Sequence, residues 1–188
     1  MKIGFIGTGL MGFPMAKNLL KKNLTLKVFN RSLEKAKPLE KFGATISTSL
    51  EQVVIGSDIT ILMLTDDVEV EKVLGDQKFL ANLKPQSTVI DMSSIKPKIA
   101  IYYGNLLKKK NINFLDAPVS GGTIGAEQAS LAIMVGGEQK VFDNVVNILN
   151  AMGNSTLVGP NGSGQVSKLA NQIIVGITIG AVAEAITL

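Results

Sequence analysis

The sequence has 188 residues, of which 46% are hydrophobic and 18% charged, so the chain can bury a core and is not expected to be disordered. It contains no cysteine and no histidine, which excludes disulfide bonds, thiolate or serine–histidine catalysis and an ordinary zinc site. The net charge of +4 comes from scattered lysines among only 5% aromatic residues, so no nucleic-acid partner is expected. Glycines interrupt the first apolar stretch, unlike in a secretory signal, so a cytoplasmic location is expected.

Short apolar segments alternate with longer segments whose apolar residues recur at helical spacing. The segments expected as strands are Lys2–Gly7, Thr25–Phe29, Ile59–Leu64, Thr88–Met92, Asn113–Leu115, Leu131–Val135 and Thr156–Val158. The segments expected as helices are Leu10–Lys21, Leu33–Phe42, Leu50–Ile55 with a capping box at Thr48 and Glu51, Val68–Leu74, Pro97–Lys110 and Glu138–Met152. This alternation predicts an α/β fold, a doubly wound, mainly parallel Rossmann sheet over residues 1–162.

The loop after the first strand has the glycine spacing of a dinucleotide-binding loop, in the order Gly7, Thr8, Gly9, Leu10, Met11 and Gly12. A strand before the loop and a helix after it make a phosphate site more plausible than a chance glycine-rich turn. The first glycine permits the tight turn, the second lets pyrophosphate approach the backbone, and the third lets helix and strand pack closely. Free amides at the start of the helix would then hold the phosphates.

The end of the second strand, Asn30-Arg31-Ser32, bears on which nucleotide binds. NAD-binding sites commonly place a carboxylate here for the ribose 2′-hydroxyl, whereas NADP-binding sites need a cation for the 2′-phosphate. The sequence has no carboxylate at this point, and the Arg31 guanidinium is suited to a phosphate. NADP(H) is therefore preferred, with NAD(H) as the alternative. In the simpler interpretation, Asn30 and Ser32 cap the next helix and Arg31 faces water.

Two later motifs also carry polar groups suited to a small ligand. In the first, Ser120, Gly121 and Gly122 follow a strand, where exposed amides and a hydroxyl can bind a carboxylate, although an ordinary turn explains them equally well. In the second, Lys168 and Asn171 are three residues apart and lie on one face of a helix.

Taken in order, GFIGTGLMG, DAPVSGG and the G-x-G-x-x-x-K-x-x-N arrangement resemble the β-hydroxyacid dehydrogenases, the family of 3-hydroxyisobutyrate dehydrogenase, tartronate semialdehyde reductase and the glyoxylate/succinic semialdehyde reductases. The resemblance spans essentially the whole chain. It implies an oxidoreductase in which Lys168 is the catalytic acid/base. It also implies that Ser120, Gly121, Gly122 and Asn171 bind the substrate, a small hydroxy acid or aldehyde, and that Leu64 and Ser94 lie near the ribose and nicotinamide of the cofactor.

Members of this family continue into an all-helical domain after a helix that corresponds to residues 163–188, and we expect that domain to be absent here. This last segment is apolar around most of its circumference, so we expect it to be buried against a second copy of the chain in a homo-oligomer. A membrane span is not expected, because Lys168, Asn171, Gln172 and Glu184 interrupt the apolar run. Without the helical domain, we expect poor turnover and a pKa of Lys168 near its ordinary value of about 10.4.

Two other functions remain open. An enzyme similar to 6-phosphogluconate dehydrogenase would share the glycine loop and the Ser-Gly-Gly motif, but those enzymes usually carry a histidine soon after the lysine, and this chain has none. A non-catalytic dinucleotide-binding or dimerisation module would retain the fold without using Lys168.

Overall fold

The apolar segment after Met1 forms the centre of the sheet. In the computed structural model, which describes residues 1–188, β1 (Lys2–Ile6) lies between β2 (Thr25–Phe29) and β4 (Ile59–Leu62) and is parallel to both. The strand order is β3-β2-β1-β4-β5-β6-β8-β7, with β9 paired to β8. Strands β1, β2 and β3 follow one another toward one edge of the sheet, and β4, β5 and β6 follow one another toward the other edge. The carboxyl ends of β1 and β4, where the strand order reverses, therefore border the crevice in which Rossmann folds bind ligands.

The remaining strands extend the sheet on either side of this centre. They are β3 (Thr45–Ile46), β5 (Thr88–Asp91), β6 (Asn113–Asp116), β7 (Val119–Ser120), β8 (Leu131–Gly136) and β9 (Gly153–Gly159). Strands β1 to β6 are mutually parallel, and β8 is antiparallel to β6 and β7. The predicted doubly wound, mainly parallel sheet is therefore confirmed.

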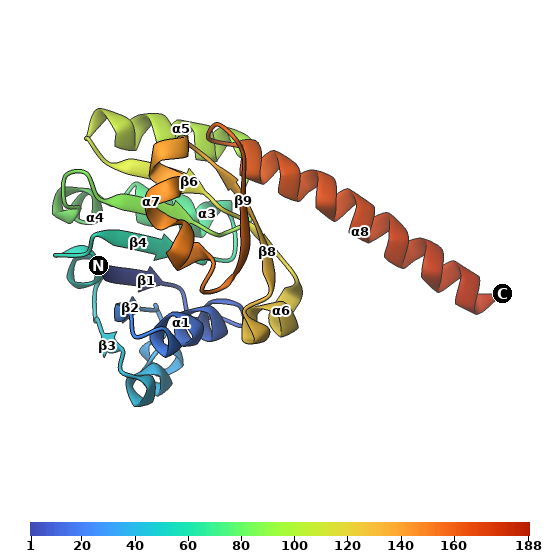
Figure 1. The fold of residues 1–188 in the computed structure, drawn as a ribbon, viewed down its shortest axis with the longest axis horizontal. Coiled ribbons are helices and arrows are strands. Elements are labelled where there is room, and N and C mark those ends of the chain that lie inside the picture. The colour runs from blue at the N-terminus through green and yellow to red at the C-terminus, as the bar shows by residue number, and fades with distance from the viewer.

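Helices cover both faces of the sheet (Figure 1). On one face, the buried core includes side chains of α1 (Gly12–Lys21), η2 (Lys37–Phe42), α6 (Gly122–Gln128) and α7 (Gln139–Leu149). On the other face it includes side chains of α2 (Leu50–Val54), α3 (Asp67–Leu74), α4 (Gln77–Asn82) and α5 (Pro97–Lys109). Alternate strand residues supply the two cores, as Phe5 and Ile6 do in β1.

Two local predictions were wrong. The expected helix over residues 33–42 is a pair of 3₁₀ segments, η1 (Leu33–Lys35) and η2, because Pro38 has no N–H to donate to an α-helical bond. The expected capping box at Thr48 and Glu51 is displaced by one residue. Ser49 is the N-cap, its hydroxyl accepts a hydrogen bond from the Gln52 amide, and the Gln52 side chain accepts one from the Thr48 amide.

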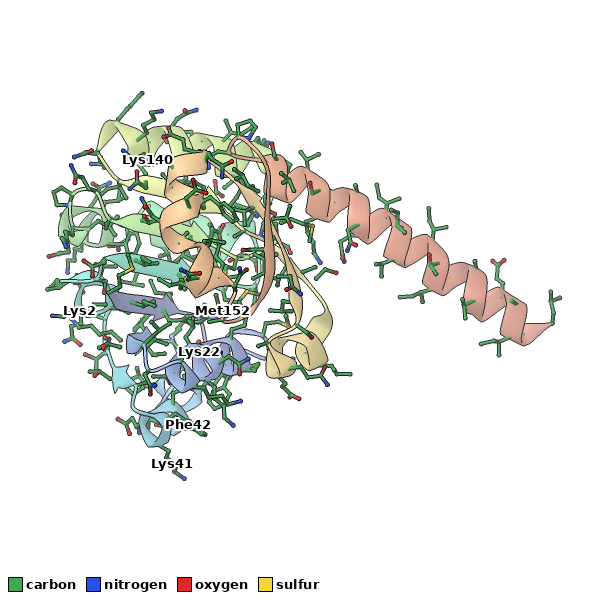
Figure 2. The ribbon with its side chains drawn as sticks, in the orientation of Figure 1. Lys2, Lys22, Lys41, Phe42, Lys140 and Met152 are labelled. Atoms are coloured by element: carbon green, nitrogen blue, oxygen red, sulfur yellow. The ribbon has the colours of Figure 1, made fainter.

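The last helix, α8 (Ser163–Thr187), leaves the body of the molecule after its first turns (Figure 1). It begins at the residue expected for the second segment, although the division into domains stays a prediction. Every side chain from Gln172 onward is exposed, and Figure 2 shows the apolar ones without neighbours. By length and hydropathy alone α8 could cross a membrane, so the exclusion of a membrane also stays a prediction.

Candidate dinucleotide and substrate site

The turn after β1 leaves no room for a side chain at two of its three glycines. A Cβ added to Gly7 would overlap the Met63 carbonyl oxygen, and the φ of Gly7 is 98°. A Cβ added to Gly12 would overlap the Gly7 carbonyl oxygen, so the start of α1 packs directly on the end of β1. Gly9 has no such neighbour within 4 Å, which leaves its backbone open to a ligand. These surroundings suit the three roles expected of a dinucleotide loop.

Polar contacts from the end of β2 fix the conformation of this loop. The Asn30 side-chain oxygen accepts a hydrogen bond from the Thr8 amide at 2.8 Å, and its NH₂ group donates to the Ser32 carbonyl at 2.9 Å. Ser32 occupies the N-cap position of η1, but its side chain makes no capping bond. Within the loop, Leu10 is exposed and Met11 half-buried. Asn30 therefore positions the loop, a role that the sequence did not indicate.

A cavity of about 170 Å³ lies between the glycine loop and the ends of β2 and β4. Six of the residues predicted to bind cofactor line it, namely Gly7, Gly9, Asn30, Arg31, Ser32 and Leu64. Glu69, which was not predicted, also lines it, and its carboxylate pairs with the Arg31 guanidinium at 3.1 Å. We refer to this cavity as the nucleotide pocket.

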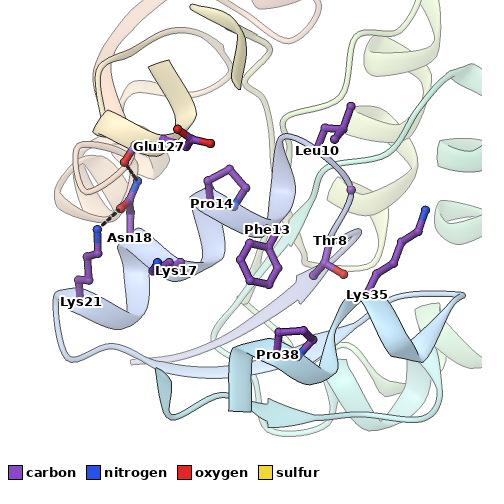
Figure 3. Close-up of a pocket in the computed structure, with 11 residues that line it drawn as sticks. Thr8, Leu10, Phe13, Pro14, Lys17, Asn18, Lys21, Lys35, Pro38 and Glu127 are labelled. Carbon is purple, nitrogen blue, oxygen red and sulfur yellow. Dashed lines mark hydrogen bonds between the residues drawn. The ribbon is translucent and has the colours of Figure 1, made fainter. Parts of the chain in front are cut away.

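A larger groove of about 640 Å³ extends from the glycine loop along α1 (Figure 3). Among its lysines, Lys17 lies over the Phe42 ring at 4.4 Å from the centroid, and Lys21 donates to the Asn18 side-chain oxygen. Lys35 lines both the groove and the nucleotide pocket and forms no ion pair. Lys35 is therefore a second cation, besides Arg31, that is available to an anionic group in the nucleotide pocket.

A second polar cluster joins the first turns of α8 to Ser120 at the end of β7. The Asn171 amide donates to the Ser120 hydroxyl at 3.1 Å and to the Gln172 side-chain oxygen at 3.4 Å. The Lys168 ammonium donates to the same Gln172 oxygen at 2.8 Å. The structure thus brings together three residues that the sequence predicts for the substrate site, and it adds Gln172, which the sequence did not single out.

The turn beside this cluster combines two glycines with unusual backbone conformations. Gly121 has φ 132° and Gly122 has φ 61°, and the chain passes through them from β7 into α6. The helix α6 was not predicted, because a segment with two glycines, GTIGAEQ, has low helix propensity.

Buried contacts hold the start of α8 against the ends of β5 and β6. The Asp116 carboxylate accepts hydrogen bonds from the Gly162 amide at 2.7 Å and the Gln165 amide at 3.1 Å. The Gln165 side chain accepts from the Ile95 amide and donates to the Ser93 carbonyl. These contacts fix the part of α8 that carries Lys168.

The loop after β5 contributes to both parts of the site. The Ser93 hydroxyl accepts a hydrogen bond from the Leu64 amide at 2.9 Å and so links this loop to the nucleotide pocket. Ser94 lines a cavity of about 230 Å³ together with Lys168 and Gln172. The predicted residues Leu64 and Ser94 therefore lie in two different cavities, and contact with ribose or nicotinamide stays a prediction.

The expected pKa of Lys168 was wrong. Partial burial lowers the pKa of the Lys168 ammonium below its ordinary value, even with most of α8 exposed. The protein atoms around Lys168 displace part of the water that would otherwise solvate its ammonium, and this disfavours the charged form.

The nucleotide pocket and the polar cluster around Lys168 both lie at the carboxyl edge of the parallel sheet. Residues 2–160 match the family described as the NAD binding domain of 6-phosphogluconate dehydrogenase. The chain belongs to this family.

Named relatives agree with the resemblance to the β-hydroxyacid dehydrogenases. This NAD-binding domain is 44% identical to 2-hydroxy-3-oxopropionate reductase from Escherichia coli, over 99% of the chain and 64% of that relative. It superposes with a TM-score of 0.93 on Mycobacterium tuberculosis 3-hydroxyisobutyrate dehydrogenase with L-serine, at 32% identity, over 98% of the chain and 63% of that structure. It also superposes on Psf3 in complex with NADP⁺ and 2-OPP, with a TM-score of 0.94 and 26% identity, over 98% of the chain and 66% of that structure. The chain thus spans less than two thirds of the length of each.

Two carboxyl groups of the NAD-binding domain are buried side by side. Asp91 and Asp116 are partners in the pairing of β5 with β6. One Asp91 oxygen accepts from the Ser93 amide at 3.0 Å, and the other is buried without a partner. Burial raises the pKa of Asp91 to about 7, and repulsion from Asp116 contributes.

We expect Asp91 to make folding dependent on pH. Because its folded pKa of about 7 exceeds the ordinary 3.8, its contribution to stability is full at low pH and is lost as the pH rises toward 7. The amide in Asp91→Asn does not titrate, so the variant does not share this loss. The unfolding free energy of the variant minus that of wild type should therefore increase by about 1–3 kcal/mol between pH 5 and pH 8. Urea unfolding at both pH values measures this change. The exposed Asp143→Asn is the control, and an equal difference at both pH values would refute the expectation.

Proposed function

We propose that the chain is the cofactor-binding part of an NADPH-preferring oxidoreductase that interconverts a small carboxylate-bearing aldehyde and its hydroxy acid. The hydrogen-bonded series from Ser120 through Asn171 and Gln172 to Lys168 carries the proposal, because it joins a turn suited to an anion with an amine that can transfer a proton. The names 2-hydroxy-3-oxopropionate reductase and 3-hydroxyisobutyrate dehydrogenase support the same substrate class.

Each residue of the cluster has a role in this proposal. When bound, the reduced nicotinamide supplies the hydride. The Ser120 hydroxyl and the adjacent glycine backbone hold the substrate carboxylate, and Asn171 orients the substrate beside Lys168. The Lys168 ammonium donates a proton to the carbonyl oxygen as it becomes a hydroxyl, and the neutral amine takes that proton back in the oxidation. Gln172 holds the Lys168 side chain through its 2.8 Å hydrogen bond.

The decisive experiment is a reductase assay on a chimera. It would continue the chain after Leu188 with the part of the Escherichia coli relative beyond the matched region, and it would be tested on glyoxylate, tartronate semialdehyde and succinic semialdehyde with NADPH. Oxidation of NADPH with at least one of these supports the proposal. The chain alone is expected to turn over slowly, because α8 beyond Asn171 is exposed and the site is open to water. A chimera that binds NADPH but reduces none of them would favour a non-catalytic nucleotide-binding module.

Arg31 tests the preference for NADPH. A guanidinium–phosphate contact is strong, so Arg31→Ala should raise the Kd for NADPH by about tenfold or more and change the Kd for NADH by less than about twofold. Isothermal titration calorimetry of the chain with each nucleotide measures both. Lys41→Ala removes an exposed cation outside the nucleotide pocket and should leave both values unchanged. Equal losses for the two nucleotides in Arg31→Ala would contradict the preference.

We also propose that α8 is covered by protein, in a homo-oligomer located in the cytoplasm. Its exposed apolar residues extend around the helix, and they include Ile173, Ile177, Val182 and Ile186. A helix that is apolar on all sides is stable in water only when other surfaces cover it. Sedimentation of the chain in the absence of detergent tests the proposal, and a monodisperse monomer would contradict it.

A further inference from the structure

Glu69 brings a negative charge into the nucleotide pocket from an unexpected element. Glu69 follows Arg31 by 38 residues and lies on α3 rather than at the end of β2. One of its oxygens contacts the Arg31 guanidinium at 3.1 Å, and the other contacts the Lys72 ammonium at 2.7 Å. The Glu69 side chain is 27% exposed, whereas that of Arg31 is 82% exposed, so the carboxylate is the better fixed member of the pair.

The carboxylate has opposite effects on the two nucleotides. A 2′-phosphate that binds Arg31 has to displace or share the contact with Glu69, and the two anions then repel each other across one guanidinium. A ribose 2′-hydroxyl has no such conflict, because it can donate a hydrogen bond to the carboxylate, as it does to the acidic residue at the end of β2 in NAD-binding sites. Lys72 keeps the Glu69 carboxylate ionised, since this contact lowers the pKa of Glu69.

We propose that Glu69 determines nucleotide selectivity by weakening NADPH binding and supporting NADH binding, so that its charge opposes that of Arg31 and Lys35. This inference rests on the proposed nucleotide site. It assigns to α3 the selectivity carboxylate that is missing from the end of β2.

The test compares Glu69→Gln with Glu71→Gln. Both substitutions remove one negative charge from α3, but Glu71 does not line the nucleotide pocket. For Glu69→Gln we expect the Kd for NADPH to fall about three- to tenfold and the Kd for NADH to stay constant or rise up to about threefold. Glu71→Gln should change both by less than about twofold. Calorimetry with NADPH and NADH, repeated with 2′,5′-ADP and AMP, measures the effect with and without the nicotinamide half.

The outcomes separate this inference from the proposed function. An unchanged ratio of the two Kd values in Glu69→Gln, or an equal shift in Glu71→Gln, overturns the inference and leaves the nucleotide site intact. A wild-type chain that binds none of the four ligands overturns the nucleotide site and the inference together. A shift seen with both the nicotinamide nucleotides and the adenosine fragments supports the assignment of Glu69 to the 2′-position.

Discussion

Replacement of Lys168 by methionine is expected to lower the kcat of the chimera by about 10²- to 10⁴-fold, the range that positioned proton transfer contributes. Methionine keeps an unbranched side chain, one heavy atom shorter than that of lysine, but cannot donate a proton. The nucleotide pocket does not include residue 168, so the Kd for NADPH should change by less than about twofold. Steady-state kinetics and calorimetry on the same preparations give both values.

The pH dependence of the reaction provides a second measure of Lys168. Reduction requires the protonated amine, so its rate should fall as the pH rises through the pKa of Lys168. Burial lowers that pKa, so the fall should occur at a lower pH than for an ordinary lysine. Lys98→Met, which removes an exposed lysine on α5, is the control. Full activity in Lys168→Met would exclude this residue as the proton donor.

The sequence predicts the features of the site that arise from neighbouring residues. The glycine spacing at 7, 9 and 12 is a local pattern, and each of these positions has the surroundings that the pattern implies. The pairing of Asn171 with Ser120 was less direct, because 51 residues separate them. The resemblance to a family placed both residues at the substrate site, but their hydrogen bond was not predicted, since spacing along the chain does not reveal which strand ends meet.

The remaining site residues depend on contacts that no local pattern reveals. Glu69 lies on a helix whose surface charges appear ordinary in the sequence, and it enters the nucleotide pocket only because β4 lies beside β1. Lys35 was hidden for a different reason. The expected α-helix over residues 33–42 is 3₁₀, which changes the direction of each side chain along the segment.

Gly12→Ala is expected to destabilise the chain by about 3 kcal/mol and to weaken NADPH binding by at least about 100-fold. The added methyl group would overlap the backbone carbonyl oxygen of Gly7 and approach the ring of Phe5, which is buried in the core. The start of α1 would have to move away from β1, and the loop amides would lose the arrangement that suits a pyrophosphate. Thermal unfolding and calorimetry measure the two losses.

Two matched substitutions distinguish packing from ligand contact. Gly9→Ala adds the same methyl group where no atom lies within 4 Å, so stability should be unchanged while NADPH binding falls, because the methyl occupies space needed by the phosphates. Gly176→Ala on α8 also meets open space and should leave binding unchanged. If Gly9→Ala bound NADPH as tightly as wild type, the phosphates would have to lie elsewhere. An unfolding temperature of Gly12→Ala equal to that of wild type would contradict the explanation that glycine is required at residue 12 by the close contact between β1 and α1.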